Sequence, residues 1–97
     1  MKVFISQPMG GLTEAEIKSE RESIREFVKG VYREDIEVLD TYFEDYDGTP
    51  LQFLAKSLDV LSQADVAVFV KGYEKARGCR IEEACCRDYG IKRLLMQ

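Results

Sequence analysis

The chain has 97 residues, of which 45% are hydrophobic and 33% charged, and this length and composition predict one domain, residues 1–97, around a single modest core. Its net charge of −4 argues against a protein that binds nucleic acid, since affinity for the phosphate backbone depends on Lys and Arg side chains. No apolar run approaches the roughly 20 residues that span a bilayer, and the start, MKVFISQPMGG, is too short and glycine-broken for a signal peptide, so we expect a cytoplasmic protein with no membrane contact.

The first part of the chain predicts a strand and a helix. Val3–Ile5 is a short apolar run that suits a buried central strand, and a loop with two glycines follows it at residues 6–12. Thr13 and Glu16 form a capping-box pattern, so a helix is expected to begin there and to end near Lys29-Gly30.

Two further features precede the middle of the chain. The charged side chains of the first helix, Arg21 and Arg25 among them, are expected on a solvated face. Residues 36–40 are a second strand candidate with Asp40 at its C-terminal end, and residues 41–50 form an acidic, aromatic loop. We expect the rings of Tyr42, Phe43 and Tyr46 in this loop to pack within the protein rather than to stack on a flat ligand.

The second half of the chain continues the alternation of strands and helices. A stripe of leucines predicts a helix over residues 50–61, and residues 66–70 are apolar on both faces, as a covered strand requires. A helix from about Arg77 to Tyr89 and a strand over residues 91–96 complete the pattern. Four strands and three main helices in alternation predict a three-layer α/β/α domain with a parallel sheet of order 2-1-3-4.

The C-terminal edge of such a sheet is where ligands bind in open α/β folds. Here it brings together the loop after the first strand, the loop after Asp40 and the turn around Gly78. Glycine-containing turns that lead into helix N-termini favour an anion such as a phosphate or carboxylate, and Arg77 and Arg80 strengthen that interpretation. Neither turn matches a G-x-G-x-x-G or P-loop pattern.

Glu82 is the first candidate for chemistry at this edge. If its carboxylate faces the crevice, it can attack or stabilise a sugar C1′ as the bond to a leaving group breaks. A favourable interaction with the helix dipole or simple solvent exposure explains a glutamate at this position equally well. The neighbouring Glu83 shows that an acidic residue is easily accommodated here. The acid partner that such chemistry needs is sought among Asp40, Asp45 and Asp59 by rough location.

Neither a metal nor an organic cofactor is expected. The three cysteines, Cys79, Cys85 and Cys86, lie close together without a C-x-x-C pair, and the chain has no histidine. A structural zinc site needs four ligands, so small buried or half-buried reduced thiols are the favoured interpretation.

Three segments carry a family resemblance: FISQPMGGLTEAEI at 4–17, ADVAVF at 64–69 and KGYEKARGCRIEEACCRDYGI at 71–91. Together they resemble small bacterial and phage proteins described as nucleoside 2-deoxyribosyltransferase-like. The wider superfamily comprises 2-deoxyribosyltransferases and 2′-deoxynucleoside 5′-phosphate N-hydrolases. The resemblance implies a flavodoxin-like sheet, a homodimer or larger homo-oligomer, a nucleoside or nucleotide partner, and a Glu nucleophile at the start of a late helix.

The family spacing sets a small residue four positions and a glycine eight positions after the nucleophile. Glu82, Cys86 and Gly90 fit it, which favours Glu82 over Glu83. Asp40 and Asp59 are the candidate acid partners in catalysis. Sugar or phosphate is expected to contact two loops, whose candidate residues are Ser6, Gln7, Pro8, Met9, Gly10, Gly11, Arg77, Gly78 and Arg80.

The chain also departs from the family pattern. The hydrolases have a Tyr where this chain has Val3, and an Asp where it has Ser57. Asp59 can replace that Asp only if its helix is rotated or shifted.

Three functions follow from these observations. The first is N-glycosidic bond chemistry on a nucleoside or deoxynucleotide, either 2-deoxyribosyl transfer or hydrolysis, through Glu82. The second is a binding module that keeps the nucleotide crevice without the chemistry, and the third is a structural or partner-binding domain.

Overall fold

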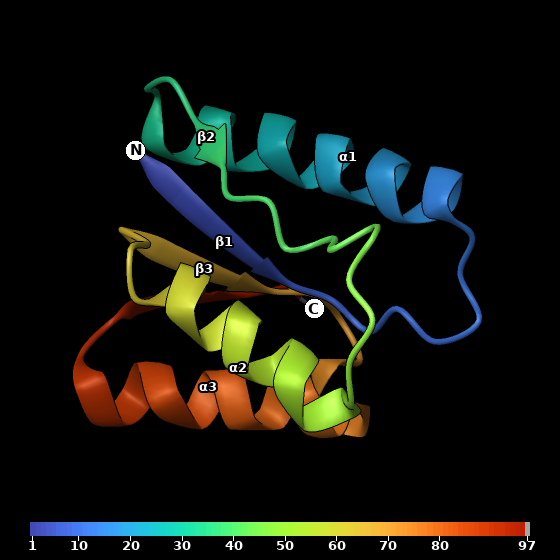
Figure 1. Ribbon diagram of the computed structural model, residues 1–97. Helices are drawn as coiled ribbons and strands as arrows, with labels where there is room; N and C mark the ends of the chain where they lie inside the picture. The colour runs from blue at the N-terminus through green and yellow to red at the C-terminus, as the bar shows by residue number, and fades with distance from the viewer. Residues whose placement is uncertain (97) are drawn as a thin grey trace.

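The sheet has four parallel strands in the order β2-β1-β3-β4, which confirms the predicted topology. The computed structural model describes residues 1–96. Its strands are β1 (Lys2–Ser6), β2 (Glu37–Val38), β3 (Val66–Phe69) and β4 (Lys92–Leu95). Helix α1 (Glu14–Tyr32) covers one face of the sheet, and helices α2 (Pro50–Leu61) and α3 (Arg77–Tyr89) cover the other (Figure 1).

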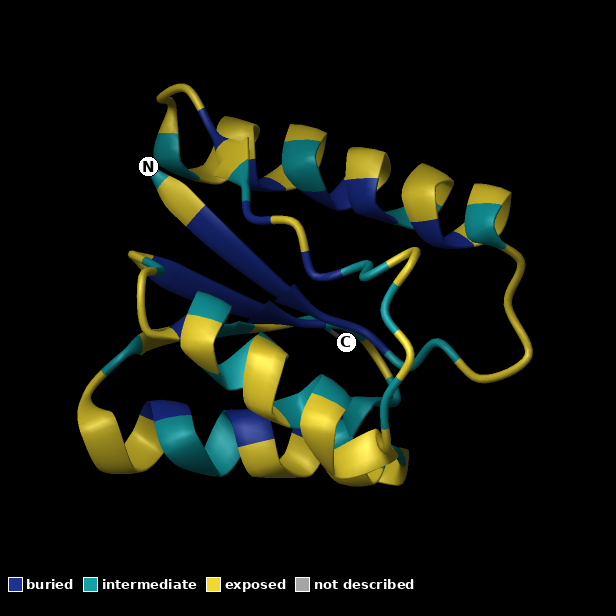
Figure 2. Cartoon of the chain, in the orientation of Figure 1, coloured by how far each residue is buried: buried dark blue, intermediate teal, exposed yellow. Residues whose placement is uncertain are grey.

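Side-chain alternation along the strands builds one core on each face of the sheet. Val3 and Ile5 of β1 join Ile24 and Val28 of α1 in the first core. Phe4 joins Leu61, Ala67, Phe69 and Cys86 in the second. Figure 2 shows the central strands buried and the outer sides of the helices exposed. Both faces of β3 are buried, which explains its unbroken apolar sequence.

Capping residues fix where the helices begin. Thr13 and Thr49 both form capping boxes, with Glu16 and Gln52 respectively, and Pro50 occupies the first turn of α2. Helix α3 follows Ala76, whose side chain makes no capping hydrogen bond.

Several boundaries differ from the prediction. Helix α1 continues past Gly30 and ends at Tyr32. Arg33 adopts the left-handed conformation there (φ 55°), and its backbone N–H donates a hydrogen bond to the carbonyl of Lys29. Strand β2 is shorter than residues 36–40, and a 3₁₀ turn, η1 (Tyr73–Lys75), precedes α3 where no element was predicted. None of the helices in residues 1–96 is long and apolar enough to cross a membrane.

Candidate functional site

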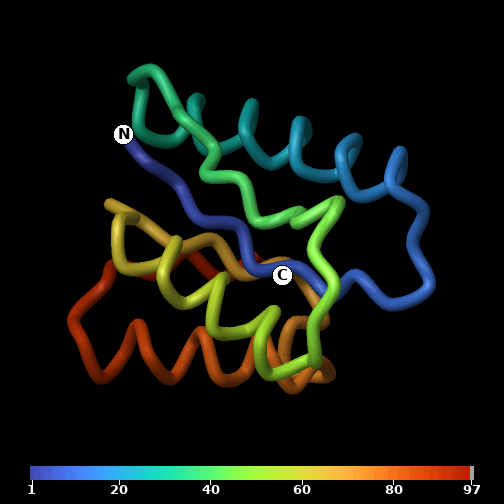
Figure 3. The backbone as a smooth tube through the Cα atoms, viewed as in Figure 1, coloured from blue at the N-terminus to red at the C-terminus, as the bar shows by residue number. Residues whose placement is uncertain are grey.

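A pocket of about 250 Å³ opens at the C-terminal edge of the sheet. The segments that follow β1 and β2 run to this edge (Figure 3), and the first turns of α2 and α3 close it from the other side. The lining residues are Phe4, Ile5, Ser6, Gln7, Pro8, Met9, Thr41, Pro50, Phe53, Leu54, Ser57, Ala76, Gly78, Cys79 and Glu82. This is the edge at which the sequence predicts a ligand site.

Glu82 lies in this pocket because of its position on α3. Cys79, Glu82 and Cys86 are the buried residues of that helix, and their spacing of three and four residues places them on one face. The Glu82 side chain is 8% exposed, and Ser6 Oγ at the end of β1 donates a 2.6 Å hydrogen bond to Glu82 Oε1. The neighbouring Glu83 does not line the pocket, and its carboxylate pairs with Arg87 and Arg93.

Burial raises the pKa of Glu82 to about 7. The hydrogen bond from Ser6 and the positive charge of Arg21 act in the opposite direction, since both favour the ionised carboxylate. The Glu82 carboxylate is therefore close to half ionised at neutral pH. Such a group can act as a nucleophile when ionised and can also carry a proton near physiological pH.

A buried polar network supports the wall of the pocket formed by Gln7 and Thr41. Arg21 Nε donates to Gln7 Oε1 (2.6 Å), and Arg21 Nη2 donates to Thr41 Oγ1 (2.7 Å). Gln7 Nε2 in turn donates to Glu20 Oε1 (2.6 Å). The expectation that Arg21 lies on the solvated face of α1 is therefore wrong, because its side chain is buried and contacts the segments after β1 and β2.

The sequence holds a signal for this burial. Arg21 lies four residues after Ile17 and three before Ile24, so it falls on the same helix face as these buried side chains. Thr41 had no comparable signal, because it follows a two-residue strand in an irregular segment.

The candidate binding residues divide into two groups. Ser6, Gln7, Pro8, Met9 and Gly78 line the pocket. Gly10, Gly11, Arg77 and Arg80 are not among the lining residues.

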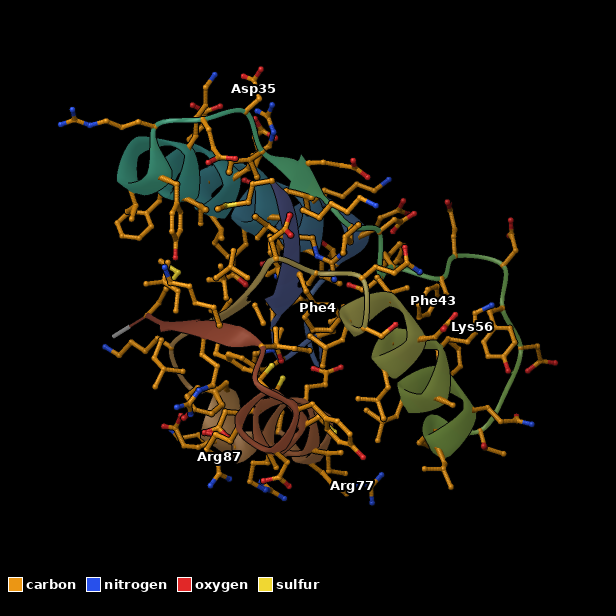
Figure 4. All side chains as sticks on the ribbon, turned by 90° about the vertical axis from the view of Figure 1, so that its left-hand side faces the viewer. Phe4, Asp35, Phe43, Lys56, Arg77 and Arg87 are labelled. Atoms are coloured by element: carbon orange, nitrogen blue, oxygen red, sulfur yellow. The ribbon has the colours of Figure 1, made fainter. Side chains whose placement is uncertain are left out.

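The two arginines lie outside the pocket. Arg77 is exposed (Figure 4) and lines an adjoining groove between α2 and α3, while Arg80 donates from Nη1 to the carbonyl of Glu74 (2.9 Å). Among the described lining residues there is thus no Lys or Arg, and Glu82 is the one charged side chain.

None of the candidate acid partners lines the pocket. Asp40 is exposed and accepts a 2.9 Å hydrogen bond from the backbone N–H of Tyr42. Asp45 and Asp59 are exposed as well. The helix α2 presents Ser57 to the pocket instead, so Glu82 has no second carboxyl group beside it among the described lining residues.

Two aromatic residues of the 41–50 loop, Phe43 and Tyr46, pack against α2. Lys56 Nζ lies 5.1 Å from the ring centroid of Phe43 and 4.3 Å from that of Tyr46, and Figure 4 shows Phe43 and Lys56 together. Tyr46 meets Phe53 edge to face, with ring centroids 4.9 Å apart. Phe53 in turn lines the pocket, so the loop supports the apolar wall.

Cys79 lines the pocket one turn before Glu82, and burial raises the pKa of its thiol. Burial also raises the pKa of Cys86, to about 11. Both thiols are protonated at neutral pH and act as small packing groups. Within residues 1–96, no three or more His, Cys, Asp or Glu side chains are grouped so that they could hold a metal ion.

This fold is similar to that of a solved 2-deoxyribosyltransferase. That enzyme, from Bacillus psychrosaccharolyticus, superposes with a TM-score of 0.61 at 16% sequence identity, over 98% of this chain and 71% of the enzyme. A conserved protein from Enterococcus faecalis superposes with a TM-score of 0.66 at 12% identity, and this chain spans 62% of its length. At these identities the similarity shows the fold alone. No family model and no curated protein matches the sequence.

Proposed function

We propose that the protein breaks the N-glycosidic bond of a 2-deoxynucleoside or its 5′-phosphate, with Glu82 as the nucleophile. The observation that carries the proposal is the buried Glu82 carboxylate in a pocket at the C-terminal edge of the sheet, held by Ser6. The similarity in fold to a 2-deoxyribosyltransferase adds support, as does the family spacing of Glu82, Cys86 and Gly90.

Ser6 prepares the carboxylate for attack. Its hydroxyl occupies Oε1, which leaves Oε2 to approach the sugar C1′. As the Glu82 Oε2–C1′ bond forms, the C1′–N bond breaks and its electron pair moves to the base nitrogen. Because Glu82 is the only carboxyl group among the described lining residues, the departing base takes its proton from solvent.

The second step releases the sugar. A water molecule or another nucleobase attacks C1′, and the ester bond to Glu82 breaks with its electrons returning to the carboxylate. A proton from the attacking water or base passes to solvent. Hydrolysis and transfer thus share one intermediate and differ only in the acceptor.

The two walls of the pocket suit the two halves of a nucleoside. Ser6, Gln7 and Thr41 supply polar side chains for the sugar. Phe53 and Leu54 form an apolar wall against which a flat base can pack.

The test supplies each of the common 2-deoxynucleosides and their 5′-monophosphates, with and without a foreign free base, and follows the bases by chromatography. We expect release or exchange of base by the wild-type protein and none by Glu82→Ala. Glu83→Ala is the matched control, since this carboxylate pairs with Arg87 and Arg93 outside the pocket. No turnover with any substrate, or equal turnover in Glu82→Ala, would contradict the proposal.

A second candidate is a nucleotide-binding module without turnover. The pocket favours it in one respect, because Ser57 lines it at the position where the resemblance to the hydrolases implies an Asp. Calorimetry separates the two: this function predicts saturable nucleotide binding with no released base. Binding that persists without product in both wild type and Glu82→Ala would favour the module over the enzyme.

A further inference from the structure

Arg21 has an environment that is costly for a guanidinium group. Its side chain is 8% exposed, and none of the ion pairs among residues 1–96 includes it. A buried charge without a directly opposed partner destabilises a protein unless hydrogen bonds compensate it. The two bonds that Arg21 makes must therefore be important to the structure around them.

The two hydrogen bonds connect Arg21 to two different loops. Arg21 Nε reaches Gln7 in the segment after β1, and Nη2 reaches Thr41 in the segment after β2. Gln7 and Thr41 are 4% and 6% exposed and both line the pocket. One planar guanidinium thus ties together two pocket-lining residues that are 34 residues apart in the chain.

The network also fixes the orientation of the Gln7 amide. Arg21 can only donate and the Glu20 carboxylate can only accept, so Oε1 of Gln7 must face Arg21 and Nε2 must face Glu20. One N–H and one lone pair of the amide are left over for a ligand. Rotation of the amide by half a turn would lose both existing bonds.

We infer that Arg21 is a positioning residue, which holds Gln7 and Thr41 in place around Glu82 without lining the pocket itself. Three carboxylates attract its positive charge: Asp40 in the segment after β2, Glu82 on α3 and Glu20 on α1. In return it favours the ionised form of Glu82. The inference rests on the pocket of the proposed function, but its measurements need no turnover.

Side-chain amide NMR tests the inference directly. The chain has four glutamines and no asparagine, so the Gln7 amide pair can be identified by its loss in Gln7→Leu. In the wild-type protein this pair should exchange slowly with solvent. In Arg21→Met and in Arg21→Lys it should exchange about tenfold faster or more, because a bond to a charged donor is lost and lysine lacks the planar fork.

The two substitutions separate geometry from charge. Titration of the Glu82 carboxyl by NMR should move to higher pH in Arg21→Met and stay near the wild-type position in Arg21→Lys, which keeps the charge. Arg25→Met, one turn along α1 in an exposed cluster with Glu22 and Glu26, should change neither measurement. If Gln7 keeps its wild-type protection in folded Arg21→Lys, the inference is wrong, and this comparison decides even if Arg21→Met fails to fold.

Thr41→Val tests the second branch of the network. It should lower the folding equilibrium constant of the wild-type protein by about fivefold and have a smaller effect in Arg21→Lys, where the bond is already lost. Fully additive effects would contradict the link between Arg21 and Thr41. These measurements stand apart from the proposed function, since an inactive protein with an intact network would refute the chemistry and leave the role of Arg21 supported.

Discussion

Glu82 should make the stability of the protein depend on pH in a defined window. Its pKa is about 7 in the folded protein against 4.5 for an exposed glutamate. Because the folded state holds the proton more tightly, the stabilisation is complete below about pH 4.5, declines as the pH rises, and is lost above about pH 7. The difference is about 2.5 pH units, which at about 1.4 kcal/mol each amounts to roughly 3 kcal/mol.

Glu82→Gln removes this dependence, because glutamine stays neutral and its Oε1 can still accept from Ser6. We expect the variant to gain about 2.5 kcal/mol relative to wild type between about pH 5 and about pH 8. Urea unfolding of both proteins at the two pH values measures this gain. Glu74→Gln, an exposed carboxylate outside the pocket, controls for the general effect of losing a negative charge.

The refuting result is a difference between Glu82→Gln and wild type that does not change with pH. That outcome would mean that the Glu82 carboxylate is ionised at no cost in the folded protein. The reasoning that burial places it near half ionisation would then fail, whatever activity the protein has.

Three further predictions concern individual hydrogen bonds and backbone positions. Ser6→Ala removes a donor that favours ionised Glu82, so NMR titration should show the pKa of this carboxyl rising by about 1 further unit; no rise would mean that the bond is unimportant. Thr13→Ala should destabilise the protein by about 1 kcal/mol in urea unfolding, whereas an unchanged midpoint would argue against the capping box. Arg33→Gly should stabilise it by about 0.5 kcal/mol or more in thermal melts, since φ is 55° there, and a loss of stability would refute this.

The order of elements could be predicted because the central strands are continuous apolar runs and the helices carry apolar residues at helical spacing. Residues 66–70 are apolar throughout, as a strand covered on both faces must be, and Thr13 and Thr49 mark helix starts through their own side chains. The bounds of strand β2 were harder to predict, because it lies at the edge of the sheet and only Glu37 and Val38 pair with β1. The η1 turn has too few residues to show any period.

The site was harder to predict because it depends on which way single side chains point. The family spacing with Cys86 and Gly90 favoured Glu82, but its burial beside Cys79 and Cys86 was seen only in the structure. Arg21 was expected on a solvated face, although helical spacing sets it beside the buried Ile17 and Ile24. For Asp59, proximity in sequence was misleading: residues two apart on a helix face different directions, so Ser57 reaches the pocket and Asp59 does not. Thr41 enters the network through contacts between loops, which no local pattern encodes.

The central claim is that Glu82 forms a covalent bond to a sugar, and mass spectrometry of the intact protein tests it most directly. Fluorine at C2′ of a deoxynucleoside analogue slows both the formation and the breakdown of a glycosyl-enzyme, because both transition states are oxocarbenium-like. A good leaving group at C1′ restores the rate of formation alone, so the intermediate should accumulate. We predict that the wild-type protein gains the mass of the fluorinated sugar, that the peptide containing Glu82 carries it, and that Glu82→Gln gains nothing. Release of base from natural substrates without any adduct, or an adduct on another residue, would contradict the claim.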